Sequence, residues 1–343
     1  MTLDTRFERL QLPLEHDFTI SRGTTTEADL VVVEIEDESG TVSVGGAGPS
    51  SHYGETADTV EAVLPDLLTV VEDVGDPHQL EGIERRMRET VGRNPAARCA
   101  VSIALHDLVS KQLDVPLYQY WGLDPAEAVS TSYTIGIDPT ERMRERAAAA
   151  VDAGHEILKV KLGTGRDEEI VAAIREAAPE ATVRVDANEA WTPREAVRMT
   201  EVLADYGVEF VEQPVPAEDP GGLQFVYENG ALPIAADESC ITLEDVPGIA
   251  DKADIANLKL MKCGGLREAK RMIHAAHAHG LEVMLGCMTE SNASIAAGAH
   301  LAPLLDYADL DGSLLLAEDP YDGPVNDDGT ITLSETPGTG ARP

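Results

Sequence analysis

The sequence predicts an α/β protein whose main part is an eight-stranded (β/α) barrel, preceded by a smaller α+β unit. From about residue 128 onward, short runs of β-forming residues alternate with helical stretches, which is typical of parallel strands joined by helical crossovers. Polar residues recur there at a steady period, since 25, 26 and 25 residues separate Lys161, Asp186, Glu212 and Asp237 in turn. They fall near the C-terminal ends of the predicted strands, where such barrels carry their chemistry.

Residues 1–125 are expected to form the separate α+β unit, a capping domain. Its first 60 residues look antiparallel, with strands predicted at 30–37 and 41–48 around a turn at 38–40. Three helices are predicted after them, at 56–72, 78–91 and 95–112. The last of these shows an apolar stripe with the period of an α-helix.

Residues 126–312 are expected to form the barrel. The predicted strands are 130–137, 156–163, 182–188, 208–215, 233–239, 254–262, 281–287 and 307–312. Helices between them include 140–153, 193–206 and 266–279. Residues 313–343 are rich in Gly, Pro and Asp, and we expect this segment to return to the capping domain.

The charge of the chain is strongly negative, with 62 acidic residues against 26 basic ones and a formal net charge of −36. The acids are spread over the whole length, which favours a halophilic protein, with an acidic surface suited to a high-salt cytoplasm. An acidic face for a cationic partner is the alternative. Nucleic acid is not expected as a partner, because no basic patch exists to displace phosphate counterions.

The chain shows no sign of a membrane segment or a disulfide framework. No stretch reaches 18 apolar residues, and charged residues occupy the N-terminus where a signal peptide needs an apolar run. The four cysteines have no CxxC spacing and read as reduced thiols: Cys99, Cys240, Cys263 and Cys287. We expect a cytoplasmic protein that forms a homo-oligomer and makes no contact with membranes.

Lysine is concentrated where the chemistry is expected. The chain has seven lysines, and four of them lie in the pairs Lys159/Lys161 and Lys259/Lys262 on two predicted strands. Alternation along a strand places Lys159 and Lys161 on one face. Two amines on opposite sides of a carboxylate-bound cation can move a proton from one face of a carbon atom to the other.

Three acids lie between the lysine pairs, one on each intervening strand: Asp186, Glu212 and Asp237. A single aspartate at a strand end is usually a helix cap, but recurrence at one level of a repeating unit favours a site. Three carboxylates without His or Cys suit a hard cation, Mg²⁺ above all. The cation and partial burial are expected to lower the pKa of the neighbouring lysines.

Five motifs resemble the muconate-lactonising subgroup of the enolase superfamily, and within it the dipeptide epimerases. They are KVK (159–161), VDAN (185–188), VEQP (211–214), ADES (236–239) and KLMKCGG (259–265). The resemblance implies a modified TIM barrel of the (β/α)7β type, with an N-terminal α+β capping domain that the C-terminal segment completes.

The resemblance also implies roles for individual residues. Asp186, Glu212 and Asp237 would be the ligands of one Mg²⁺ per subunit, with Mn²⁺ as the alternative ion. Lys161 and Lys259 would be the acid–base pair, as enolase-superfamily sites use Lys or His bases. Lys159 would help to neutralise the substrate carboxylate. Lys259 takes the family position in KLMK, and Lys262 is expected to point outward or to be structural.

Further residues are implied for the substrate. Asp309 and Asp311 resemble the DxD motif that grips the α-ammonium group of a dipeptide. Residues 18–34 and 48–56 resemble the specificity loop of these enzymes and the strand behind it. The family residues that match Thr134, Cys287 and Thr289 line the substrate cleft. Arg22 is the only basic residue between positions 10 and 85, so it is the single candidate there for a side-chain carboxylate.

The sequence therefore predicts a Mg²⁺-dependent dipeptide epimerase. One lysine removes the α-proton of the C-terminal residue, an ene-diolate forms, and the other lysine returns a proton on the opposite face. L-Ala-D/L-Glu is the commonest family substrate, but a hydrophobic or other dipeptide is favoured if Arg22 points elsewhere. The alternatives are o-succinylbenzoate synthesis, cycloisomerisation or N-acyl amino acid racemisation at the same site, and a non-catalytic metal- or ligand-binding protein.

Overall fold

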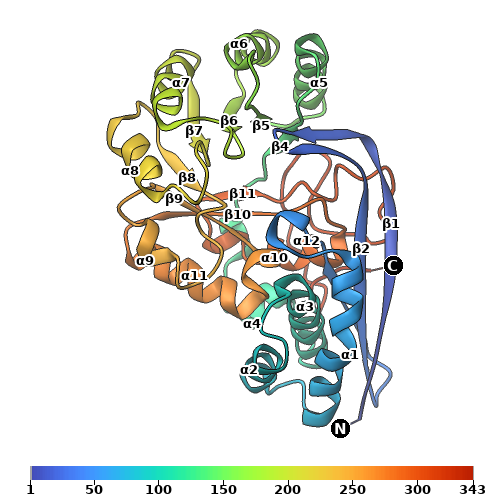
Figure 1. Ribbon diagram of the computed structural model, residues 1–343. Coiled ribbons are helices and arrows are strands. Elements are labelled where there is room, and N and C mark those ends of the chain that lie inside the picture. Colours follow the sequence, from blue (N-terminus) through green and yellow to red (C-terminus); the bar gives the residue numbers. More distant parts are fainter. Residues whose placement is uncertain (1, 343) are drawn as a thin grey trace.

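A computed structural model describes residues 2–342 and shows a parallel barrel with an antiparallel sheet and helices beside it (Figure 1). The barrel strands pair in the order β11-β10-β9-β8-β7-β6-β5-β4. A parallel bridge between Thr131 and Ala308 brings its two edges together. The strands are β4 (Tyr133–Ile135), β5 (Ile157–Lys161), β6 (Thr182–Asp186), β7 (Val208–Glu212), β8 (Ile234–Ala236), β9 (Ile255–Lys259), β10 (Glu282–Gly286) and β11 (Tyr307–Asp309).

Helices connect each barrel strand to the next, and no helix follows β11 in the described chain, so the predicted (β/α)7β order is confirmed. They are α5 (Thr140–Asp152), α6 (Asp167–Ala177), α7 (Pro193–Asp205), α8 (Pro220–Asn229), α9 (Val246–Ile249), α10 (Leu260–Cys263), α11 (Leu266–Ala278) and α12 (Asn292–Ala299). Short α10 and the longer α11 both follow β9. Sequence signals define such helices locally: α7 begins with a capping box between Thr192 and Glu195 and has proline at its first position.

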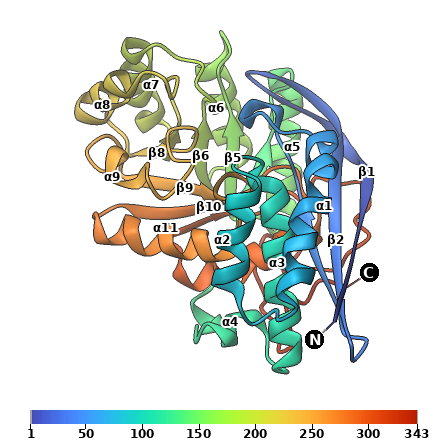
Figure 2. The ribbon, with the colours of Figure 1, turned by 60° about the horizontal axis from the view of Figure 1, so that its bottom comes forward.

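The N-terminal unit is a three-stranded antiparallel sheet covered by helices (Figure 2). Its elements are β1 (Leu3–Ile20), β2 (Gly23–Asp37), β3 (Val42–Ala47), α1 (Ala57–Val74), α2 (Leu80–Thr90), α3 (Pro95–Gln112) and α4 (Leu117–Tyr120). Residues 96–110 of α3 are almost all buried, because this helix packs on the sheet and also contacts α10 and α11 of the barrel. The unit is therefore fixed against the barrel through a shared apolar core.

The long β1–β2 hairpin differs from the sequence prediction, which placed a strand only from residue 30. In the structure β2 begins at Gly23 and pairs with β1 almost to its end, so Ser21 and Arg22 form a two-residue tip. Gly23 has a φ of 154°, which residues with a side chain rarely adopt. The polar stretch before residue 30 gave no sign of a strand because it is exposed on the hairpin.

Two further expectations are refined. Residues 48–56, likened to the region of the specificity loop and the strand behind it, form a loop with a 3₁₀ turn at Ser51–Tyr53. The strand predicted at 254–262 ends at Lys259, and the next four residues form α10, which ends at Gly264 with a φ of 88°. The lysines of KLMK therefore lie on different elements.

The C-terminal segment runs back along the N-terminal unit. The backbone N–H of Glu15 donates to Leu315, and that of Leu117 donates to Gly338. Thr339 donates from its backbone N–H to the buried carboxylate of Asp107 on α3. Within residues 2–342 no helix is both long and apolar enough to span a membrane.

Candidate active site

A cavity of about 390 Å³ opens where the C-terminal ends of the barrel strands meet the tip of the β1–β2 hairpin. Both parts of the molecule line it. Nine predicted site residues reach it: Arg22, Thr134, Lys159, Lys161, Lys259, Cys287, Thr289, Asp309 and Asp311. The three predicted metal ligands do not line it; they are fully buried at or just after the ends of their strands and pair with the lysines that do. We call these three carboxylates the floor of the cavity.

The floor carboxylates are held by neighbouring side chains. Asn257 donates from Nδ2 to Oε1 of Glu212 over 2.8 Å, and Asn188 donates from its backbone N–H and from Nδ2 to Asp186. Burial raises the pKa of Glu212 to about 8, and the neighbouring charges of Asp186 and Asp237 act in the same direction. The buried carboxylates therefore disfavour one another's ionised form, and positive charge beside them offsets this effect.

The oxygens at this floor fit a bound cation. Oδ1 of Asn188 and Oδ1 of Asn257 are buried and accept no hydrogen bond. Oε2 of Glu212 is instead paired with the ammonium group of Lys159, whose Nζ lies 2.7 Å away. Buried acceptors without donors are rare in proteins and indicate an ion or water partner. An all-oxygen set of this kind suits Mg²⁺.

Lys161 and Lys259 lie on opposite sides of this floor. They end β5 and β9, the second and sixth strands of the barrel. Lys161 Nζ donates to Oδ2 of Asp186 over 2.6 Å, and Lys259 Nζ donates to Oδ2 of Asp237 over 2.7 Å. Each amine thus contacts a different carboxylate while both face one cavity.

The predicted lowering of lysine pKa values is not seen with protein groups alone. Burial lowers the pKa of Lys259, but Asp237 and Tyr53 raise it more, so it lies well above its ordinary value. Lys159 behaves in the same way because Asp309, Glu212 and Asp186 surround it. Positive charge placed on the carboxylates would offset this stabilisation of the ammonium form.

Lys159 links the floor to the DxD pair. Its Nζ lies 2.6 Å from Oδ2 of Asp309 and 2.7 Å from Oε2 of Glu212. Ser132 donates to the other oxygen of Asp309, and the backbone N–H of Thr134 donates to Asp311. Burial raises the pKa of Asp311 to about 7, and Asp309 adds to the effect. A cationic group bound there would be stabilised by both carboxylates.

Lys262 is fully buried, so the outward position left open by the sequence is wrong. Its Nζ donates to Oδ1 of Asp237 over 2.6 Å and to the backbone carbonyls of Asp237 and Asn257. It therefore fixes Asp237 from below. Gln213, which the sequence did not suggest, accepts from the backbone N–H of Asp237.

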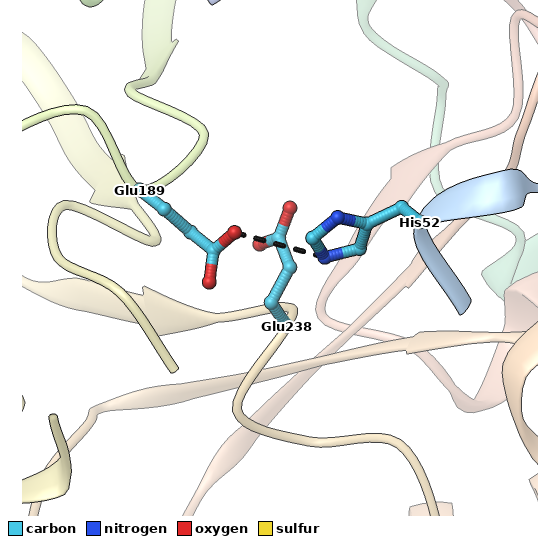
Figure 3. Close-up of side chains that lie close together, drawn as sticks. All are labelled: His52, Glu189 and Glu238. Carbon is cyan, nitrogen blue, oxygen red and sulfur yellow. Dashed lines mark ion pairs between the residues drawn. The ribbon is translucent and has the colours of Figure 1, made fainter. Parts of the chain in front are cut away.

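A second charged group lies at the edge of the cavity, and we call Arg22, His52, Glu189 and Glu238 the rim cluster. Arg22 donates to Oε1 of Glu238 over 2.7 Å and to Oε2 of Glu189 over 3.1 Å. Figure 3 shows His52, Glu189 and Glu238 converging, with His52 3.6 Å from Glu189. Among residues 2–342, His52, Glu189 and Glu238 are the only three His, Cys, Asp or Glu side chains whose ligand atoms all lie within 4.8 Å of one another. The predicted metal ligands Asp186, Glu212 and Asp237 are not that close together. Sequence reasoning identified Arg22 but not its partners.

Comparison with known proteins identifies the family of this chain. The family model for the N-terminal domain of mandelate racemase / muconate lactonizing enzymes matches residues 5–122, and that for the enolase C-terminal domain-like region matches residues 142–343. The chain belongs to this family of the enolase superfamily. A curated member, the L-Ala-D/L-Glu epimerase of Bacteroides thetaiotaomicron, is 40% identical over 96% of this chain and 85% of its own.

Two solved structures of family members carry ligands. A dipeptide epimerase from Enterococcus faecalis V583, complexed with Mg and L-Leu-L-Tyr, is 37% identical with a TM-score of 0.91, and 99% of each chain is covered. A dipeptide epimerase from Methylococcus capsulatus, complexed with Mg and L-Arg-D-Lys, is 36% identical with a TM-score of 0.92 over 99% of each chain. The family thus includes enzymes for dipeptides with very different side chains.

Proposed function

We propose that this protein is a Mg²⁺-dependent dipeptide epimerase, an isomerase that inverts the α-carbon of the C-terminal residue. The observation that carries the proposal is the placement of two buried lysines, Lys161 and Lys259, on opposite sides of one carboxylate-rich floor. A binding protein has no use for a base on each side of its ligand. A 1,1-proton transfer needs both.

The residues divide the work as follows. Lys161 or Lys259 takes the α-proton, and the other lysine delivers a proton to the opposite face of the same carbon. Lys159 neutralises the substrate carboxylate, as the family resemblance implies. Asp186, Glu212 and Asp237 would hold Mg²⁺, which when bound supplies the positive charge that stabilises the substrate carboxylate as negative charge develops on it.

The DxD pair distinguishes a dipeptide from an N-acylated amino acid. Asp309 and Asp311 both line the cavity and are almost fully buried. A free α-ammonium group matches two carboxylates, whereas an acylated amine brings no charge to them. The pair is thus the feature that favours dipeptides over the N-acyl amino acids that the same floor could process.

The test is epimerisation of L,L-dipeptides in deuterated buffer with saturating Mg²⁺, followed by NMR or mass spectrometry of the α-position. We expect diastereomer formation together with incorporation of one solvent deuteron. N-succinyl amino acids serve as the comparison substrates, and Asp309→Asn is expected to lose dipeptide activity. Turnover of the N-acyl substrates alone would contradict the proposal.

We also propose that the enzyme works in a high-salt cytoplasm as a homo-oligomer. The proposal of high salt rests on the formal net charge of −36, since concentrated salt screens repulsion between surface carboxylates. Sedimentation analysis in molar KCl tests the assembly.

A further inference from the structure

The rim cluster bears on the side chains that the cavity accepts. We propose that Arg22 fastens the hairpin tip to the barrel instead of receiving a substrate carboxylate, so that the enzyme selects dipeptides without an acidic side chain. The inference rests on the proposed epimerase function and names its substrate class.

The guanidinium group of Arg22 is hydrogen-bonded to residues of the barrel. One terminal nitrogen of this group lies 3.1 Å from Glu189 and 3.3 Å from the backbone carbonyl of Asn188, and the other lies 2.7 Å from Glu238. The neighbouring tip residue, Ser21, donates to the same Asn188 carbonyl over 3.0 Å. Both tip residues are therefore tied to the barrel.

The barrel residues that hold the hairpin tip have an unusual backbone conformation. Asn188 and Glu189 adopt positive φ angles of 42° and 68°, which are uncommon for residues other than glycine. This conformation begins two residues after the end of β6, and the Asn188 carbonyl accepts from the hairpin tip. Glu189 is fixed in turn, since its Oε1 accepts from the backbone N–H of Ala217 over 2.8 Å. Strained backbone of this kind persists where surrounding contacts determine it.

The rim cluster has no positive charge to spare for a substrate. One guanidinium faces the two carboxyl groups of Glu189 and Glu238, so the cluster carries no net positive charge. His52 adds no positive charge at neutral pH, because burial and, to a smaller extent, the charge of Arg22 lower its pKa. A carboxylate arriving with the substrate would have to displace an acid that is already bound to Arg22.

The remaining wall of the cavity also offers no free positive charge. Glu27 lines it from the hairpin, is exposed and makes no ion pair with any residue in 2–342. Asp29 also lines it and is paired with Arg9. The other cationic side chains that line the cavity are Lys159, Lys161 and Lys259; each is bound to a floor carboxylate, and in the proposed reaction they serve the α-carbon and its carboxylate. An acidic side chain thus meets an uncompensated negative charge and no unbound cation.

Membership of the family does not decide which substrate side chains the enzyme accepts. Related enzymes carry names or ligands with acidic, aromatic and cationic side chains, namely L-Ala-D/L-Glu, L-Leu-L-Tyr and L-Arg-D-Lys. Selection among them must therefore come from residues around a shared floor, and in this chain those residues are the rim cluster and Glu27.

The experiment compares near-isosteric pairs of substrates with the Mg²⁺-loaded enzyme at one fixed KCl concentration. We expect kcat/KM for L-Ala-L-Gln to exceed that for L-Ala-L-Glu by roughly tenfold or more, the scale of one unscreened charge several Å away. L-Gln-L-Ala and L-Glu-L-Ala test the other side chain in the same way. L-Ala-L-Lys is expected to match or exceed L-Ala-L-Gln.

Two variants test whether Glu27 causes the preference for neutral side chains. Glu27→Gln removes the free carboxylate and is expected to reduce the Gln-to-Glu ratio about threefold or more. Glu8→Gln removes an exposed charge from the same hairpin away from the cavity and should leave the ratio unchanged. Equal or faster turnover of L-Ala-L-Glu overturns the inference while leaving the epimerase function intact. No turnover of any dipeptide overturns the proposed function instead.

Discussion

The floor and the rim of the cavity hold their charges in different ways. On the floor, the side chains of Lys161 and Lys259 are only 10% and 9% exposed, and each lysine ends a barrel strand. At the rim, the Arg22 side chain is 31% exposed and occupies a two-residue turn. Rigid, buried strand ends suit a proton transfer that needs fixed distances. A turn at the surface suits selection among side chains, because loops vary without disturbing the barrel.

Metal removal tests whether the catalytic cation belongs to the floor or to the rim. Exhaustive chelation is expected to abolish turnover and Mg²⁺ to restore it, because the buried carboxylates of the floor need a divalent partner. Asp186→Asn should raise the Mg²⁺ concentration required for half-maximal activity, whereas His52→Gln at the rim should not. Activity in metal-free enzyme, or a shifted Mg²⁺ requirement in the His52 variant, would contradict a floor site.

Removing either floor lysine is expected to have the next largest effect. Lys161→Ala or Lys259→Ala should reduce epimerisation by roughly 10²- to 10⁴-fold, the contribution of a positioned acid or base. Each variant should still exchange the α-proton of one diastereomer with solvent deuterium, because the opposite lysine remains. Circular dichroism checks that the fold is kept, and wild-type epimerisation in either variant would refute the two-base assignment.

Substitution at the rim is expected to reduce activity less than substitution of a floor lysine, and to change KM more than kcat. Arg22→Gln should lower kcat/KM for a neutral dipeptide by roughly tenfold, mainly through KM, because the hairpin tip is no longer held over the cavity. Arg6→Gln is the matched control, since Arg6 pairs with Glu34 and Glu36 on the same hairpin but outside the cavity. A loss of kcat as large as that of the lysine variants would erase the distinction between floor and rim.

Acid stability tests how the parts around the barrel are joined. His300 on the barrel side accepts from the backbone N–H of Tyr118 and contacts the carbonyl of Thr339 in the C-terminal segment. Burial lowers its pKa to about 4, so the folded state binds its proton less readily than the unfolded chain. Stability is therefore lost as the pH falls from about 6.5 to about 4, by roughly 3 kcal/mol at most.

The comparison is the free energy of unfolding against pH for the wild type and two variants. His300→Gln should flatten the curve in that window relative to the wild type. His16→Gln, which changes an exposed histidine on the hairpin, should not. Equal slopes for all three proteins would show that His300 does not carry the effect.

Salt is expected to act on the whole surface, with the smallest effect per residue. At a formal net charge of −36, the melting temperature should climb steadily from 0.1 M to 2 M KCl as the screening length falls. Free Mg²⁺ is held constant, because binding at the floor stabilises by itself. NaCl should act like KCl, and a flat profile would favour a cationic partner for the acidic surface.

The floor could be predicted from the sequence because it repeats. Lys161, Asp186 and Glu212 each end a strand, and a barrel brings the C-terminal ends of its strands together at one mouth. Alternation along each strand then decides which side chains share a face. The sequence left Lys262 open as outward or structural, and the structural alternative holds because β9 ends at Lys259 and the helical turn of α10 redirects the chain.

By itself the sequence determined the barrel, its strand order and the floor, since these follow from local periodicity and from side chains repeated at one level. Only the tertiary structure decided the rim. Arg22 meets Glu189 and Glu238 across separations of 167 and 216 residues, and no local pattern marks such a contact. The hairpin length, the turn at Ser21 and the packing of α3 on the barrel fix where Arg22 arrives. The partners of Arg22, and therefore the charges around it, depend on how the hairpin and the barrel pack together.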